Sequence, residues 1–161
     1  MGNRLYRGQA AAEASLWLHV TKTKATLADG NIFKVYGRVL VKLLWGASVT
    51  AGDGGATTLK LQEETNSVDL CAATTITGDV AGTQYRVTGD FAVILNGTGN
   101  TPVIGAVGAL SAFPKTCDFI VGMAAAVDAI QQVQTGDDAT GVIEWHVYYV
   151  PLEDGAYMEA S

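Results

Sequence analysis

The stretch from Thr140 to Ala156 reads TGVIEWHVYYVPLEDGA, and it decides the fold class. Apolar and polar residues alternate along it, and it is rich in valine, tyrosine and tryptophan, which favour strands. Pro151 interrupts the run, and Asp154-Gly155 closes it with a turn, because glycine tolerates positive φ. The stretch predicts the last strand of a β protein, with the residues after it turned towards a neighbouring subunit or the surface.

The rest of the chain repeats this pattern in shorter pieces. Glycine is abundant, at 19 of 161 residues, and runs rich in threonine and valine lie between the glycine-rich breaks. Strand patterns cover residues 16–27, 31–36, 38–45, 57–62, 83–88, 91–95, 128–134 and 142–150. About eight to ten short strands predict an all-β, antiparallel β-sandwich or β-barrel, a jelly roll being one possible form.

Turn signals suggest how neighbouring strands connect. Asp29-Gly30 predicts a hairpin between the first two strands, and the segment TGDDATG at 135–141 predicts the polar tip of a last hairpin. Gly37 marks a bulge or a break. A helix competes with a strand only in MAAAVDAI at 123–130, which is short and has no clear cap.

Length and composition predict one domain with a terminal arm. At 161 residues the chain suits a single β domain over 16–161, preceded by a flexible N-terminal arm over 1–15. The arm lacks the apolar segment of a secretory signal, and no apolar run is long enough to span a bilayer. We expect synthesis in a cytoplasm and no membrane partner. Residues 96–114, rich in glycine, predict a long loop.

The charge content points to a covered surface. Hydrophobic residues make up 48% of the chain and charged residues only 16%, which is low for a soluble monomer. Seven of the ten basic residues lie within the first 42 residues, against two acidic ones. Such asymmetry can steer a segment onto an acidic partner, and a solvated strand edge bearing lysines explains it equally well.

Few residues are available for metal or cofactor chemistry. Cys71 and Cys117 fit buried free thiols in a reducing compartment, and sequence leaves their pairing open. Neither His19 nor His146 stands at a ligand spacing from them, and AGDGGATT at 51–58 lacks the lysine of a phosphate-binding loop. We expect no metal and no cofactor.

The same scarcity argues against an enzyme. A hydrolytic triad needs a histidine with a nucleophile and a carboxylate, and both histidines lie within alternating strands, where packing or interface roles are commoner. No serine stands in a nucleophile-elbow sequence. We expect no catalytic residue.

The aromatic residues raise the question of a stacking platform. The set is Trp17, Trp45, Trp145, Tyr148 and Tyr149. Acidic residues at 144, 153 and 154 flank three of them and repel phosphate, so nucleic acid is disfavoured as a partner. Carbohydrate stacking stays open, beside packing in the core or at a subunit interface.

Several segments in order resemble a known family. They are LADGNIF at 27–33, VYGRVLV at 35–41, VDLCAA at 68–73, TGVIEW at 140–145 and YVPLEDGA at 149–156. Together they resemble the small β-rich capsid decoration, or cement, proteins encoded in the head gene cluster of tailed bacteriophages. The resemblance leaves out the first fifteen residues, and the loop at 96–116 departs from it.

This resemblance implies a virion structural protein on the capsid surface. It would bind the outside of a phage head, as a homotrimer, and stabilise contacts between subunits of the major capsid protein. The candidate capsid or subunit interface comprises Arg4, Tyr6, Arg7, Trp17, Trp145, Tyr148 and Tyr149. Alternatives are a tail-tube or head-fibre component, and a carbohydrate-binding β-module on the virion.

Overall fold

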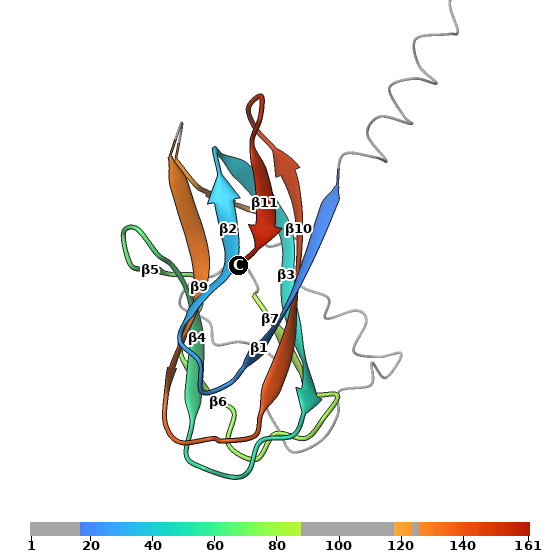
Figure 1. The fold of residues 1–161 in the computed structure, drawn as a ribbon, viewed down its shortest axis with the longest axis vertical. Helices are drawn as coiled ribbons and strands as arrows, with labels where there is room; N and C mark the ends of the chain where they lie inside the picture. The colour runs from blue at the N-terminus through green and yellow to red at the C-terminus, as the bar shows by residue number, and fades with distance from the viewer. Residues whose placement is uncertain (1–16, 88–117, 124–125) are drawn as a thin grey trace, which may run out of the picture.

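The computed structural model describes residues 17–87, 118–123 and 126–161, and within them the chain folds into strands without any helix (Figure 1). The strands are β1 (Leu18–Ala25), β2 (Gly30–Tyr36), β3 (Val39–Thr50), β4 (Thr58–Glu63), β5 (Val68–Asp69), β6 (Thr74–Thr75), β7 (Gln84–Arg86), β8 (Phe119–Val121), β9 (Val127–Thr135), β10 (Val142–Pro151) and β11 (Tyr157–Ala160). No helix that could cross a membrane occurs among these residues. The predicted all-β class is confirmed.

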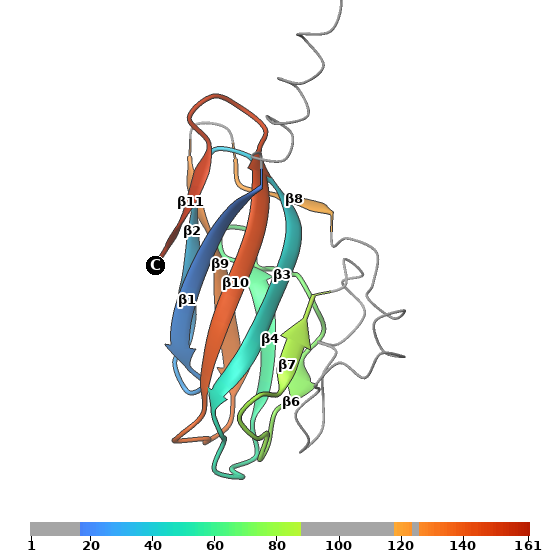
Figure 2. The same cartoon turned by 90° about the vertical axis from the view of Figure 1, so that its right-hand side faces the viewer.

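The strands form two antiparallel sheets that pack as a sandwich. Sheet A has the order β1-β10-β3-β7, with β8 also paired to β3. Sheet B has the order β11-β2-β9-β4-β5, with β6 also paired to β4. In Figure 2, β1, β10 and β3 run side by side across the front of the molecule. β1 is an edge strand of sheet A and β11 is an edge strand of sheet B. These two edges contact each other on one side of the sandwich.

The two strands of each predicted hairpin belong to opposite sheets, so both predicted hairpins are wrong. β1 pairs with β10 in sheet A, whereas β2 pairs with β9 and β11 in sheet B. β9 and β10 are likewise in different sheets. At the first crossing Thr26 is buried, and its N–H donates to the carbonyl of Gly141 at 2.8 Å. The turn residues are present, but they carry the chain across the sandwich.

One carboxylate joins three of these crossings at the same end of the molecule. Asp138, expected at a polar tip, is only 2% exposed. Its Oδ2 accepts a hydrogen bond from the Thr26 hydroxyl at 2.8 Å, and its Oδ1 accepts from the N–H groups of Asp53, Thr140 and Gly141, each at 3.1 Å. The β1–β2, β3–β4 and β9–β10 connections are thereby held together, because a buried charge requires such partners.

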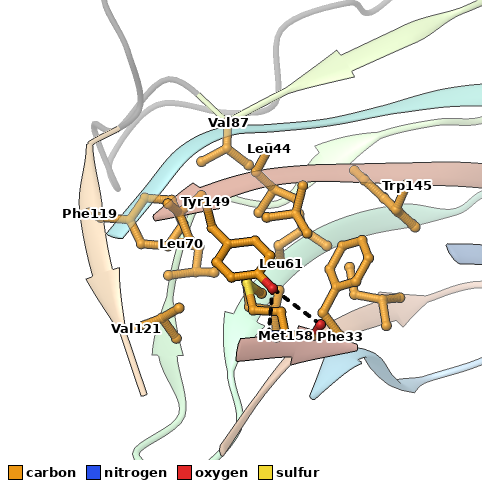
Figure 3. Close-up of a cluster of buried hydrophobic side chains, with 14 of the residues drawn as sticks. Phe33, Leu44, Leu61, Leu70, Val87, Phe119, Val121, Trp145, Tyr149 and Met158 are labelled. Carbon is orange, nitrogen blue, oxygen red and sulfur yellow. Dashed lines mark hydrogen bonds between the residues drawn. The ribbon is translucent and has the colours of Figure 1, made fainter. Parts of the chain in front are cut away.

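The core lies between the inward faces of the two sheets. Trp145 is fully buried there, facing side chains such as Phe33 and Leu61 from sheet B. Tyr149 is also buried, and its hydroxyl accepts a hydrogen bond from the N–H of Met158 at 3.0 Å (Figure 3). This bond ties β10 to the edge strand β11. Apolar burial of this extent is the main source of stability for a two-sheet fold.

The structure also tests several local predictions made from the sequence. Gly37 adopts a φ of 68° at a true break, where the chain passes from sheet B to sheet A. In the segment 123–130 the strand β9 starts at Val127, and residues 124–125 lie outside the description. The C-terminal residues do not leave the body, because they form β11 against β2. Cys71 is a free, buried thiol. The arm at 1–15, the predicted strand at 91–95 and the loop at 96–114 lie outside the described residues.

Candidate functional site on the outer face of sheet A

Four aromatic rings stand together on the outer face of sheet A: Trp45 on β3, His146 and Tyr148 on β10, and His19 on β1. We call them the ring cluster. The strand register places His146 directly beside Trp45 and Tyr148 directly beside His19. Each of these pairs has centroids 4.2 Å apart and planes within 13° of parallel. The rings of each pair are therefore stacked face to face across the strands.

Polar atoms connect the two histidines within the ring cluster. Nε2 of His19 lies 3.2 Å from Nδ1 of His146, and the hydroxyl of Thr21 lies 3.3 Å from both nitrogens. On the other side of the second ring, Nε2 of His146 lies 3.1 Å from Oε1 of Glu144. If Nε2 of His146 carries the hydrogen that faces the carboxylate, its Nδ1 is an acceptor for the N–H of His19.

Burial sets the charge of this cluster. It lowers the pKa of His146 below the ordinary value, and the charge of His19 acts in the same direction. Glu144 opposes this shift without outweighing it. Neutral His146 is thus favoured near pH 7, where an unperturbed histidine is already mostly neutral. The pair of rings shares one hydrogen, because protonating both facing nitrogens would set two N–H groups against each other.

A hollow of about 300 Å³ adjoins the ring cluster on the β7 side. Leu43, Trp45 and Tyr148 line it together with Gln84 and Arg86. Arg86 stands directly across from Trp45 in the strand register, and its guanidinium donates to Oε1 of Gln84 at 2.8 Å. The hollow therefore combines apolar and aromatic walls with one guanidinium and one amide, the composition of a small ligand site.

Exposed apolar residues flank the cluster on the same sheet. Ile120 of β8 is 62% exposed, and Trp17, just before β1, is 52% exposed. Lys42 contacts both an aromatic ring and a carboxylate. Its Nζ is 5.9 Å from the Trp17 ring centroid and 2.6 Å from a carboxylate oxygen of Asp118. Scattered exposed apolar side chains are ordinary, but a set of them near an aromatic patch has the composition of surfaces that partner proteins cover.

A second, more acidic hollow lies at one end of sheet B. Tyr36 and Tyr157 stack there with centroids 4.4 Å apart, and Val127 stands next to Tyr36 in the strand register. The adjoining hollow measures about 500 Å³ and is lined in part by Glu153 and Asp154. Its larger volume does not make it the better candidate, because it offers one aromatic wall and lacks the clustered imidazoles of sheet A.

The predicted interface residues are divided by this geometry. Tyr148 and Trp17 lie on the outer face of sheet A, as an interface requires. Trp145 and Tyr149 pack in the core of the chain itself, which removes them from any surface contact. The remaining three, Arg4, Tyr6 and Arg7, lie outside the described residues.

Sequence reasoning missed the assembly of the ring cluster. Trp45 was grouped with the other tryptophans and tyrosines, and the two histidines were considered apart from them, although Trp45, His19 and His146 all occupy outward positions of their strands. Strand parity was the available signal, because alternate residues of a strand point to opposite faces. Strand parity assigns Tyr148 and His146 to one face of β10, and Tyr149 and Trp145 to the other. It cannot indicate that β1 and β3 flank β10, since that order depends on contacts between distant parts of the chain.

The side chains on this face are of types suited to binding, and three of them also resemble a catalytic relay. Thr21, His146 and Glu144 reproduce the hydroxyl, imidazole and carboxylate of a hydrolytic relay, but acyl transfer also needs donors aimed at the developing oxyanion. Around them the backbone of β10 is paired on both sides, with β1 and with β3. No group of three or more His, Cys, Asp or Glu side chains that could hold a metal occurs in the described part of the chain.

Comparison with known proteins gives no relative: no family model, no curated protein and no solved structure matches this chain. The fold class therefore rests on the two sheets themselves. Any functional assignment rests on the outer face of sheet A and on the sequence resemblance.

Proposed function

We propose that this chain is a structural protein of a tailed-phage virion, a capsid decoration protein. In this role it binds the outer surface of the head as an oligomer, most simply a homotrimer, and stabilises contacts between subunits of the major capsid protein. The sequence resemblance supports the family, and the outer face of sheet A supports a docking role. Neither nucleic acid nor a membrane is a partner, and no catalytic step is required.

The observation that carries the proposal is the pairing of exposed apolar residues with stacked rings on one sheet face. Ile120 and Trp17 are more than half exposed, and Trp45 and Tyr148 lie further along the same face, on β3 and β10. Large aromatic side chains contribute most to interface affinity, because they bury much area and lose little conformational freedom. A partner that covers this face removes that apolar area from water.

The body of the molecule suits a clamp. Asp138 fixes three connections at one end, and the bond between Tyr149 and Met158 fixes the edge strand β11. A protein that reinforces a shell must transmit load between neighbours without deforming, and two closely packed sheets do so. Such a role needs complementary surfaces and no active site.

The test compares one substitution on each sheet. Ile120→Glu places a charge on the outer face of sheet A, and Val127→Glu is a matched control on sheet B, where that valine is 56% exposed. We expect Ile120→Glu to weaken binding to heads assembled from the cognate major capsid protein by at least about tenfold, since a buried unpaired charge is costly. Val127→Glu should bind as the wild type does. Co-sedimentation measures both.

Other outcomes would contradict the proposal. A chain that is monomeric by light scattering and does not sediment with expanded heads is not a decoration protein. Stacked rings or projecting fibres in negative-stain images would instead indicate a tail-tube or head-fibre component. Equal binding by Ile120→Glu and Val127→Glu would retain the virion role and remove sheet A as the docking face.

The hollow beside Trp45 favours a second candidate, a carbohydrate-binding module. One face of the indole is covered by His146, and the residue also lines the hollow with Gln84 and Arg86, which supply donors for sugar hydroxyls. A glycan array would reveal this activity, and Trp45→Ala should abolish it. The same substitution with no change in glycan binding, or an array with no signal, would exclude this candidate.

A further inference from the structure

The two histidines of the ring cluster and Thr21 bring three possible ligand atoms close together. Nε2 of His19, Nδ1 of His146 and Oγ1 of Thr21 form a triangle with sides of 3.2, 3.3 and 3.3 Å. The histidines are 127 residues apart in the sequence and are the only two in the chain. The fold alone brings them together, which explains why no ligand spacing was visible in the sequence.

This triangle has the size of one face of a metal coordination tetrahedron. Ligands at the zinc–nitrogen distance of about 2.0–2.1 Å lie roughly 3.3–3.4 Å from one another in tetrahedral geometry. From these distances we propose that His19 and His146 bind one divalent transition-metal ion, Zn²⁺ or Cu²⁺, with Thr21 at the third corner and water at the fourth. Imidazole nitrogen is a preferred ligand for both ions.

The surroundings of the two rings match what metal-bound histidines need. Oε1 of Glu144 lies 3.1 Å from Nε2 of His146, the nitrogen opposite the proposed ligand atom. A carboxylate in this place orients the ring and makes its other nitrogen a stronger ligand. Trp45 stacks on His146 and Tyr148 stacks on His19, so each imidazole packs against a large ring on the outer face of the sheet.

Metal binding replaces the hydrogen that the two imidazoles share. The rings are within 5° of parallel and their facing nitrogens are in hydrogen-bond contact. To receive an ion, both lone pairs must turn towards a point above the line between them. His19 must then carry its own hydrogen on Nδ1. A tilt of the two imidazole rings about their side-chain bonds achieves this. His19 and Thr21 are exposed, which leaves room for the movement.

The experiment is a calorimetric titration of the full chain with Zn²⁺ at neutral pH, in a non-chelating buffer with a phosphine reductant. We expect saturable binding of one ion per chain. His19→Gln and His146→Gln should each weaken it at least tenfold, and the double variant should abolish it. Thr23→Val, on the same face of β1, is the matched control and should bind as the wild type does, because its hydroxyl is not one of the three donors.

Glu144→Gln tests the positioning role of the carboxylate. Loss of such a partner lowers metal affinity by about 10- to 100-fold, and we expect the lower end of that range. Long-range ¹H–¹⁵N spectra report the hydrogen position on each imidazole, and this variant should lower the fraction of His146 with hydrogen on Nε2. A purely structural role would leave that fraction unchanged.

Three results would overturn the inference. They are the absence of saturable Zn²⁺ binding, equal affinity in the double histidine variant, and imidazole nitrogen shifts that do not move when the metal is added. Equal affinity would place the ion at thiols or carboxylates instead. The titration needs no capsid, so its outcome is independent of the proposed decoration role.

Discussion

The indole N–H of Trp145 donates a hydrogen bond to Oε1 of Gln132 at 3.0 Å, in the middle of the core. Trp145 belongs to sheet A and Gln132 to sheet B, and both are fully buried. The amide nitrogen of Gln132 in turn lies 2.9–3.3 Å from the carbonyl oxygens of Ala25, Thr26 and Ala28. One side chain therefore satisfies the core tryptophan and the first crossing between sheets together.

Removing either partner should destabilise the protein, and Gln132 should matter more. We expect Trp145→Phe to lower the free energy of unfolding by about 2 kcal/mol, because it leaves a buried carbonyl oxygen unpaired and a small cavity. Gln132→Leu should lower it by about 3 kcal/mol, because the indole N–H of Trp145 loses its acceptor and the buried carbonyl of Thr26 loses this donor. Urea unfolding of both variants and the double variant measures the coupling. Fully additive losses would show that the bond contributes nothing.

Gly46 faces the Trp145 ring from the neighbouring strand, and this proximity excludes a larger residue. The two residues are direct partners in the β3–β10 register. A Cβ atom at position 46 would lie 2.6 Å from Cε3 of Trp145 and 2.8 Å from Cγ2 of Ile143. We expect Gly46→Ala to cost about 1–3 kcal/mol through overpacking. Thermal unfolding should show partial rescue when Trp145→Phe is added; no rescue would place the strain elsewhere.

Alternation within each strand predicted most of the sheet content, because period-two burial is a local property. The strand expected at 31–36 is one residue longer, the strand expected at 57–62 is shifted by one residue, and the strand expected at 142–150 matches β10 closely. The hairpins failed because alternation does not tell which sheet a strand joins. That choice depends on long-range groups, among them the side chain of Gln132 and the carboxylate of Asp138, which hold the crossings.

The candidate site was predictable only in part for the same reason. The residue types were visible, but Glu144 was considered only as an acidic neighbour that repels phosphate, and its contact with His146 was not predicted. The stack of Trp45 on His146 depends on β3 pairing with β10, two strands separated by most of the chain. Tyr148 and Tyr149 looked equivalent in a run of aromatic residues, and only the pleat separates surface from core.

Asp138 should make stability depend on pH in the acid range. Burial alone would raise the pKa of this carboxyl, but hydrogen bonds from Thr26 and three backbone N–H groups outweigh it and hold the pKa below the ordinary value. The folded state therefore gains stability above the unfolded pKa of about 3.9, and loses it as pH falls through the lower folded pKa.

The matching experiment compares Asp138→Asn with Asp137→Asn, its exposed neighbour. We expect Asp138→Asn to cost about 2 kcal/mol at pH 7, because an amide nitrogen faces donors that need acceptors. The difference in free energy of unfolding between this variant and the wild type should narrow as pH falls from about 5 through the folded pKa. Asp137→Asn should stay near wild type throughout. Chemical denaturation measures this difference. A difference that is constant with pH would mean that the charge of Asp138 does not contribute to the loss of stability.

Lys22 and Lys24 should protect the edge strand β1 from pairing with other chains. Both side chains are half-buried on the inward side of this strand, and burial followed by the charge of Lys22 lowers the pKa of Lys24. Charges so placed resist the approach of another strand to an open edge. We expect Lys22→Val/Lys24→Val to form larger species in light scattering. Thr21→Val/Thr23→Val adds similar apolar area on the outer side, and equal self-association there would refute a specific role for the lysines.

Cys71 should be unreactive while the protein is folded. Burial raises the pKa of its thiol to about 11, although the N–H of Leu61, 3.3 Å from the sulfur, acts the other way. At pH 8 the thiolate that attacks a disulfide reagent is scarce, and the side chain is almost fully covered. In a Cys117→Ser variant, labelling at pH 8 should therefore follow the unfolding equilibrium across a urea series. Rapid labelling without urea would mean that β4 and the segment after β5 separate in the native state.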